Sequence, residues 1–343
     1  MVLAGLLACS GARAQDAAVQ QARDAIKRQD PAAAVKLLEA AAGQGDMQAQ
    51  AMLADVLLNA PPPVKDPQRA CRVAQPVSEA GDSLAEAIAA QCLLMRITPD
   101  AKPIEHAREF ARASMQQGDP SGAYMVYVAF ILDPANSYIR DGKPDMAAYD
   151  ALAARPLSAR AGQVEAFDAL GLAAARGHPD AALSLATYFY ETVAPNNVLR
   201  LRNVIGALLK NGPASPVLTQ FQQRAGQIVA AGNTKASVRA FTDAYRQALM
   251  LVQAADKAKA GGEACGQLRL ATIDSGDVDG AEYLPLTAPD MDHTYLVRGQ
   301  WDEVWKFTGC ERSTRVLLKF SADGWGGANF TSRVLGDAEG GKP

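Results

Sequence analysis

Apolar residues recur at the spacing of an α-helix through most of the chain. A clear example is the set Ala49, Met52, Leu53, Val56 and Leu57. Residues three and four positions apart share one face of a helix, so this set would bury one side of a helix against its neighbours. Similar sets follow one another as far as Ala260, and the pattern predicts consecutive amphipathic helices over residues 15–260.

The spacing changes to an alternation of apolar and polar residues from Cys265 onward. Alternating stretches rich in β-branched and aromatic residues occupy 267–271, 295–297, 315–320 and 328–334. Alternation is typical of strands, and Ser321-Ala322-Asp323-Gly324 has the composition of a turn between two of them. We expect roughly four to six antiparallel strands.

One of these stretches carries a row of large side chains. Trp301, Glu303, Trp305 and Phe307 lie two residues apart and would share one face of a strand. A small sheet needs large side chains to cover itself, so we interpret this aromatic face first as core and only second as a ligand platform.

A short phrase marks a repeat in the helical part. The phrase is a glycine, then a polar residue, then two variable positions and a small residue. It occurs at Gly45, Gly81, Gly118, Gly177 and Gly232. The first two intervals are 36 and 37 residues, the length of a helix pair with its turns. We expect the glycine to end one helix in a left-handed conformation and the next residue to cap the following helix.

The same residues carry a family resemblance. Gly45-Asp46-Met47-Gln48-Ala49-Gln50, Leu53, Val64-Lys65-Asp66, Arg69-Ala70 and Ala80-Gly81-Asp82 resemble a Sel-one-like repeat, a relative of the tetratricopeptide repeat. The resemblance covers roughly residues 30–260 and is best in the first two units. It implies stacked helix pairs whose concave face binds a protein or peptide segment. The chain departs from the pattern around Pro134–Arg160, where we expect a lengthened repeat or an inserted helix.

Composition divides the chain at the same place as the change of period. Of the 68 alanines, 61 precede residue 261, and all three tryptophans follow it. The sequence therefore predicts a mainly α protein: an α-solenoid over residues 15–260, a small antiparallel β domain over 261–336 and a disordered tail over 337–343.

The N-terminal residues resemble an export signal. Residues 1–8 are apolar, and Ala12-Arg13-Ala14 offers the small residues that signal peptidase accepts, so we expect a signal peptide over 1–14. Leu6-Leu7-Ala8-Cys9 offers a second interpretation, in which Cys9 is lipidated and anchors the chain to a membrane. The protein would then be periplasmic or secreted, or a lipoprotein.

Four further cysteines favour export. Cys71 and Cys92 flank Gly81 at nearly equal distances, so a helical hairpin that turns at Gly81 would bring them level. Cys265 and Cys310 are the two cysteines of the predicted β domain. An even count in an exported chain predicts two disulfides, Cys71–Cys92 and Cys265–Cys310.

Charge and motifs exclude several classes of function. A net charge of −3 offers no basic surface for nucleic acid. The chain lacks a Walker loop, a Rossmann fingerprint and a His-Glu-x-x-His zinc motif, and its three histidines are scattered. We therefore expect no catalytic, cofactor or metal site.

One enzyme-like signal needs a separate argument. Gly81-Asp82-Ser83-Leu84 matches the opening motif of a family of serine esterases, and Asp290 with His293 would complete a triad. In that family the motif follows a buried strand, whereas here it coincides with the helical repeat phrase. Ser83 is therefore expected in the first turn of a helix.

The remaining hypotheses concern binding. We expect a non-catalytic scaffold or adaptor of the bacterial cell envelope, which holds a protein segment in the solenoid groove. The aromatic residues Tyr188, Phe189 and Tyr190 are consecutive, so at least one of them would protrude and contact a partner. The alternative is an envelope glycan-binding protein that uses the tryptophans Trp301, Trp305 and Trp325; exposed tryptophans would favour it and buried ones would not.

Overall fold

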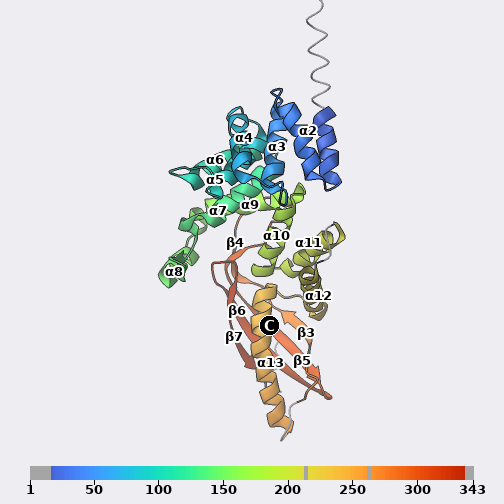
Figure 1. Ribbon diagram of the computed structural model, residues 1–343. Coiled ribbons are helices and arrows are strands. Elements are labelled where there is room, and N and C mark those ends of the chain that lie inside the picture. The colour runs from blue at the N-terminus through green and yellow to red at the C-terminus, as the bar shows by residue number, and fades with distance from the viewer. Residues whose placement is uncertain (1–16, 212–214, 261–264, 337–343) are drawn as a thin grey trace, which may run out of the picture. The chain divides into compact units, whose positions relative to one another are not determined.

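The computed structural model describes residues 17–211, 215–260 and 265–336 (Figure 1). These residues form two compact units. The first comprises the described chain up to Asn136 together with Arg176–His178, and the second comprises Ser137–Ala175 and the chain from Pro179 onward. The predicted fold class is confirmed, because successive helices pack on one another and a small antiparallel sheet follows them.

The first unit is a stack of helices joined by short turns. Residues 17–27 are helical, and the following elements are α2 (Pro31–Ala42), α3 (Met47–Asn59), α4 (Pro67–Glu79), α5 (Ser83–Leu94), α6 (Pro103–Gln116), α7 (Pro120–Leu132) and the short 3₁₀ turn η1 (Pro134–Asn136). Each of these α-helices packs against the next in the chain, as Figure 1 shows for the blue-to-green ribbons.

The repeat phrase acts at the helix ends as predicted. Gly45 and Gly81 have φ values of +86° and +85°, a conformation that favours glycine. The Asp82 side chain that follows accepts a hydrogen bond from the Ala85 backbone N–H at 2.9 Å and so caps α5. Ala85 itself is fully buried, which lets the neighbouring helices approach closely.

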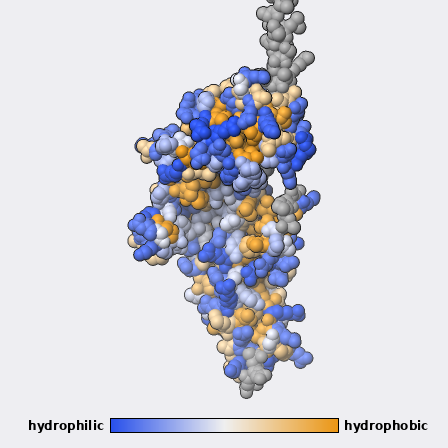
Figure 2. Space-filling model, in the orientation of Figure 1, coloured by the Kyte–Doolittle hydropathy of each residue, from blue (hydrophilic) through white to orange (hydrophobic). Residues whose placement is uncertain are grey.

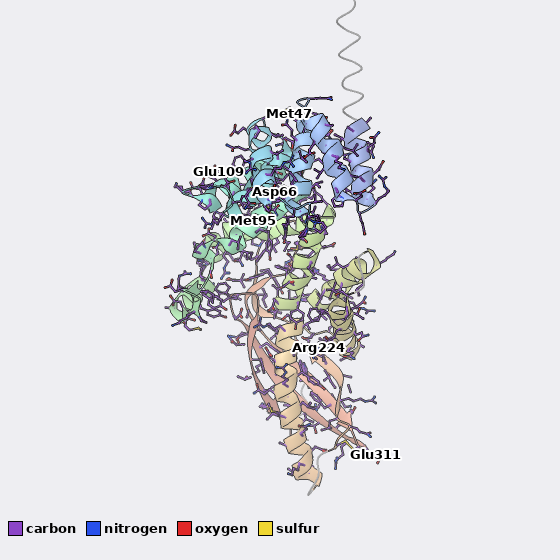
Figure 3. The ribbon with its side chains drawn as sticks, viewed as in Figure 1. Met47, Asp66, Met95, Glu109, Arg224 and Glu311 are labelled. Atoms are coloured by element: carbon purple, nitrogen blue, oxygen red, sulfur yellow. A yellow bond between two sulfur atoms is a disulfide. The ribbon has the colours of Figure 1, made fainter. Side chains whose placement is uncertain are left out.

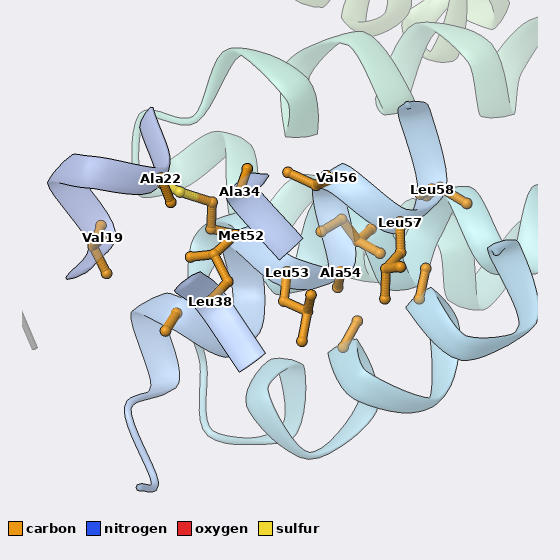
Figure 4. Packing of buried hydrophobic residues seen from close by; sticks show 14 of the residues in the cluster. Val19, Ala22, Ala34, Leu38, Met52, Leu53, Ala54, Val56, Leu57 and Leu58 are labelled. Carbon is orange, nitrogen blue, oxygen red and sulfur yellow. The ribbon is translucent and has the colours of Figure 1, made fainter. Parts of the chain in front are cut away.

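Small and branched side chains fill the core of this unit. A continuous cluster runs from Val19 through Leu38 and Leu53 to Cys92, contributed by residues 17–27 and the helices α2 to α5 (Figure 4). The predicted Cys71–Cys92 disulfide is confirmed; it joins α4 to α5 with a Cα–Cα distance of 5.9 Å.

The second unit begins with the departure from the repeat that the sequence predicted around Pro134–Arg160. After η1, which belongs to the first unit, this stretch contains β1 (Ile139–Arg140), β2 (Lys143–Pro144), α8 (Met146–Ala153) and the 3₁₀ turn η2 (Leu157–Ala159). The buried Arg160 guanidinium donates hydrogen bonds to the carbonyl oxygens of Ala153 (2.8 Å) and Gly324 (3.0 Å). It thereby ties the inserted helix to the sheet.

Helices resume after this insertion. They are α9 (Ala161–Ala175), α10 (Pro179–Glu191), α11 (Asn197–Asn211), α12 (Pro216–Ala231) and α13 (Val238–Ala260). Each helix from α9 to α11 packs against its successor, whereas α13 packs against α10 and against strands β6 and β7.

The sheet has five strands in an antiparallel arrangement. They are β3 (Arg269–Ser275), β4 (Asp279–Tyr283), β5 (Leu296–Gly309), β6 (Arg312–Ala322) and β7 (Ala328–Val334). The order is β3-β5-β6-β7, and β4 pairs with the N-terminal half of β5 beside β3. Strands β3 and β4 therefore lie on the same side of the long strand β5, and β7 forms the opposite edge of the sheet.

Helix α13 covers one face of this sheet, as the yellow-orange helix in Figure 1 shows. The rings of Phe241 and Trp305 have centroids 4.6 Å apart, and those of Tyr245 and Phe307 are 5.8 Å apart. The predicted aromatic face of β5 is thus the core between the sheet and its helix.

The second predicted disulfide, Cys265–Cys310, is also confirmed. Beside it, the buried carboxylate of Asp256 on α13 accepts the Cys265 backbone N–H at 2.7 Å and forms an ion pair with the Arg312 guanidinium at 2.9 Å. These bonds fasten the end of α13 to the β5–β6 hairpin.

Several predictions fall outside the described residues. They are the signal peptide at 1–14, the alternative lipidation of Cys9, the boundary at 261 and the tail at 337–343. Within the described ranges, no helix combines the length and the apolar run that crossing a bilayer requires.

We expect the Cys71–Cys92 disulfide to stabilise the first unit by about 3 kcal/mol, because it closes a loop of some 20 residues in the unfolded chain. Replacing both cysteines by alanine should lower the free energy of unfolding by that amount, measured by urea denaturation followed by far-UV circular dichroism.

The matched control is the double replacement Cys265→Ala and Cys310→Ala. All tryptophans lie in the second unit, so this control should shift the transition that tryptophan fluorescence reports. An unchanged dichroism midpoint in the Cys71/Cys92 variant would contradict the predicted stabilisation.

Candidate functional site

A buried carboxylate lies at the centre of the second unit. Glu303 on β5 has an exposed fraction of 0%. Its oxygens accept hydrogen bonds from the indole N–H groups of Trp301 (3.0 Å, to Oε1) and Trp305 (2.8 Å, to Oε2). Alternation along the strand puts all three side chains on the face that α13 covers, so the two indoles approach the carboxylate from the same strand.

The other donors come from the loop between α12 and α13. The Thr234 hydroxyl lies 2.9 Å from Oε1 and 3.0 Å from Oε2 of Glu303, and the Lys235 backbone N–H donates to Oε1 at 3.0 Å. A buried carboxylate without such donors would cost several kcal/mol. The hydrogen bonds therefore fix the loop on the sheet.

A lysine reinforces the same attachment. The Lys235 ammonium donates hydrogen bonds to the Ser275 hydroxyl (2.9 Å) and to the Gly276 carbonyl oxygen at the end of β3. Burial lowers the pKa of Lys235, and the nearby carboxylates of Glu303 and Asp277 oppose that shift. The donors around Glu303 come from fixed side chains and backbone, so this cluster is an anchor between loop and sheet.

The fifth repeat phrase, Gly232-Asn233-x-x-Ala236, supplies this loop instead of starting a helix. Gly232 approaches the backbone of Ile273 so closely that an added Cβ would lie 2.4 Å from the Ile273 oxygen. Helix α13 begins only at Val238, where the Ser237 hydroxyl caps it by accepting the Ala240 N–H at 3.1 Å. This phrase therefore has the same residue pattern as the others, but it forms a loop on the sheet instead of the start of a helix.

The anchored loop borders an open groove. The groove has a volume of about 800 Å³ and is formed by the C-terminal half of α12, the first half of α13 and the start of β3. Its apolar lining includes Ile228, Phe241 and Leu270, and its polar lining includes Gln227 and Tyr245.

Three arginines give this groove its charge. Arg224 of α12, Arg246 of α13 and Arg269 of β3 line it, and its lining includes no Asp or Glu. Arg246 lies 3.9 Å from the exposed Asp243, a weak surface pair. Neither Arg224, labelled in Figure 3, nor Arg269 forms an ion pair with a described carboxylate. The groove is therefore a site of positive potential above an apolar and aromatic floor.

A second hollow contains Asp290 and His293, the two residues that would complete the esterase-like triad. It has a volume of about 570 Å³ and is lined by Arg200, Tyr283, Asp290, Asp292 and His293 among others. His293 is exposed and its Nδ1 lies 3.0 Å from the Asp292 carboxylate. Ser83 is the first residue of α5, as expected, and belongs to the first unit, whereas His293 belongs to the second.

The aromatic run at 188–190 is largely core. Tyr188 and Phe189 have exposed fractions of 6% and 1%, and the Tyr188 hydroxyl lies 2.9 Å from the Thr294 hydroxyl. Tyr190 is half-buried and packs against Phe221 at a centroid distance of 5.1 Å. The predicted partner contact stays a prediction, and Tyr190 is the accessible member of the run.

The three tryptophans have different surroundings. Trp301 and Trp305 are buried, which makes them core and removes them as a sugar-stacking surface. Trp325 is half-buried; its ring stacks on Tyr149 at a centroid distance of 5.3 Å, and Tyr138 packs edge-on against it. This group of three rings is a candidate sugar platform that the sequence did not bring together.

The surface of the first unit carries exposed apolar residues. In the space-filling view, apolar patches in the first unit are interrupted by hydrophilic residues (Figure 2). Its exposed apolar residues include Met47 and Met95, both labelled in Figure 3. Within the described part of the chain, no group of three His, Cys, Asp or Glu side chains could hold a metal ion.

Comparison with protein-family models finds no match for this chain, and a search of curated proteins finds none either. The resemblance to Sel-one-like repeats therefore rests on the residues of the chain itself and stays a prediction.

We expect Glu303→Gln to lower the free energy of unfolding of the second unit by about 2 kcal/mol or more. One of the two oxygens would become an NH₂ group, which cannot accept the indole N–H or the Thr234 hydroxyl proton that now points at it. Urea unfolding followed by tryptophan fluorescence measures the change directly.

The control is Glu311→Gln in the exposed turn between β5 and β6 (Figure 3), which removes the same charge and should change stability by less than about 0.5 kcal/mol. Equal stability losses in the two variants would show that Glu303 contributes no more than a surface carboxylate.

Proposed function

We propose that this protein is a non-catalytic adaptor of the bacterial cell envelope, on the periplasmic or secreted side, and that it holds a segment of a protein partner. Two disulfides favour an oxidising compartment outside the cytoplasm. The stacked helices of the first unit supply the repeat architecture that such adaptors use.

The groove between α12, α13 and β3 is the observation that carries this proposal. It is open, large enough for several side chains, and combines an apolar floor with the guanidinium groups of three arginines. Recognition sites on proteins are built from this combination of buried apolar contacts and a polar rim. The anchored loop at 233–237 holds the two helices that form its walls, so the groove is pre-shaped.

A second candidate function is glycan binding by the rings of Tyr138, Tyr149 and Trp325. Their proximity and partial exposure favour it, because sugars stack on aromatic faces. The adaptor function has the stronger geometric support, because the groove beside β3 combines an apolar floor with positive charge in a volume of about 800 Å³.

A photocrosslinking amino acid tests the adaptor function in cells. Placed at Gln227 in the groove, it should yield a discrete crosslinked product whose second component is a protein, identified by mass spectrometry. The same group at Gln253, an exposed position farther along α13, is the control and should not yield that product. Identical products at both positions, or no crosslinked protein at Gln227, would rule out a protein partner in this groove.

A further inference from the structure

We propose that the groove takes an acidic, extended segment of a partner protein, which adds as a strand to the outer edge of β3. This inference rests on the proposed adaptor function and specifies the chemistry of the segment. Three features of the groove support it: the open strand edge, the arginines and the apolar floor.

The first feature is the backbone of β3. This strand ends the sheet, with β5 on its inner side. Gly232 forms an isolated parallel bridge with Ile273, which covers the outer edge at that point. Arg269, Leu270 and Ala271 lie before that point and line the groove, and β5 is the only strand of the described sheet that pairs with β3 there. The outer edge of β3 at these residues is therefore available to an incoming strand.

The second feature is the charge of the rim. Arg224, Arg246 and Arg269 come from three different elements and surround the groove, and its lining residues carry no negative charge. The whole chain is slightly acidic, with a net charge of −3, so this basic rim is a local feature. Guanidinium ions bind carboxylates through paired hydrogen bonds, so acidic side chains complement this rim.

The third feature is the apolar floor of the groove, which favours an acidic peptide over other anionic ligands. Ile228, Phe241 and Leu270 offer apolar contacts below the arginines. In an extended peptide, side chains alternate between two faces, so apolar residues can enter the floor while acidic ones remain at the rim. An acidic polysaccharide has the carboxylates but lacks both the apolar side chains and the backbone N–H groups that pair with a strand edge.

The first measurement uses a fluorescein-labelled peptide, Glu-Val-Glu-Leu-Glu-Val-Glu-Leu, and the purified full chain with its disulfides intact. Fluorescence anisotropy should show binding at least about tenfold tighter than that of the matched peptide with lysine in place of glutamate. The affinity should fall as sodium chloride rises from about 50 to about 500 mM, because salt screens the exposed arginines. Equal affinities for both peptides would overturn the proposal.

Charge-reversal variants locate the site. The triple change Arg224→Glu, Arg246→Glu and Arg269→Glu should weaken binding at least about tenfold. The control is Arg202→Glu, Lys210→Glu and Lys257→Glu, exposed residues outside the groove, which makes the same change in net charge and should leave affinity within about twofold. Equal loss in both triple variants would overturn the groove assignment.

Backbone methylation tests strand addition separately from charge. Two further peptides carry N-methyl groups on the glutamate amides or on the valine and leucine amides, which removes every second hydrogen-bond donor. Only one of the two sets faces β3 in a strand pair, so one peptide should lose affinity about tenfold and the other should retain it. Unchanged binding of both would overturn strand addition.

Two outcomes separate this inference from the adaptor function. If Gln227 crosslinks a protein in cells but the acidic peptide does not bind, the adaptor function stands and the proposed chemistry is wrong. If oligogalacturonate displaces the labelled peptide at lower concentration than the unlabelled peptide does, the groove prefers a polysaccharide and the peptide proposal is wrong.

Discussion

The second unit depends on the satisfaction of one buried negative charge. Glu303 lies inside the layer between the sheet and α13, where an unpaired carboxylate would destabilise the fold by several kcal/mol. Two indoles from its own strand and two donors from the α12–α13 loop satisfy it. If the loop left the sheet, the Glu303 carboxylate would lose the hydrogen bonds from Thr234 and Lys235.

The hydrogen bonds to Glu303 also determine the shape of the groove between α12, α13 and β3. Because Thr234 and Lys235 are held on β5 and β3, the end of α12 and the start of α13 flank the outer strand of the sheet. The groove with its arginines lies between these elements. A polar network in the core thus shapes the groove nearby, and the aromatic residues of β5, which the sequence predicted as core, support that network.

The helical repeats depend on interactions between residues that are close together in the chain. At Gly45, Gly81 and Gly118, a glycine at positive φ ends one helix and the aspartate that follows caps the next. Buried alanines let consecutive helices approach closely, and a disulfide links α4 to α5. The fifth phrase, at Gly232, is an exception, since the same residue pattern there forms the loop that binds Glu303.

The sequence alone determined the helices, their caps, the change to strands after Cys265 and both disulfide pairs. The helices, caps and strands depend on residues close together in the chain. The Cys71–Cys92 pair follows from the symmetry of a hairpin, and the Cys265–Cys310 pair follows because these are the two cysteines of the β domain. Only the tertiary structure decided the role of Glu303, because Thr234 lies 69 residues away from it. The same holds for the arginine groove, whose three charges come from separate elements and acquire a common function only when those elements pack together.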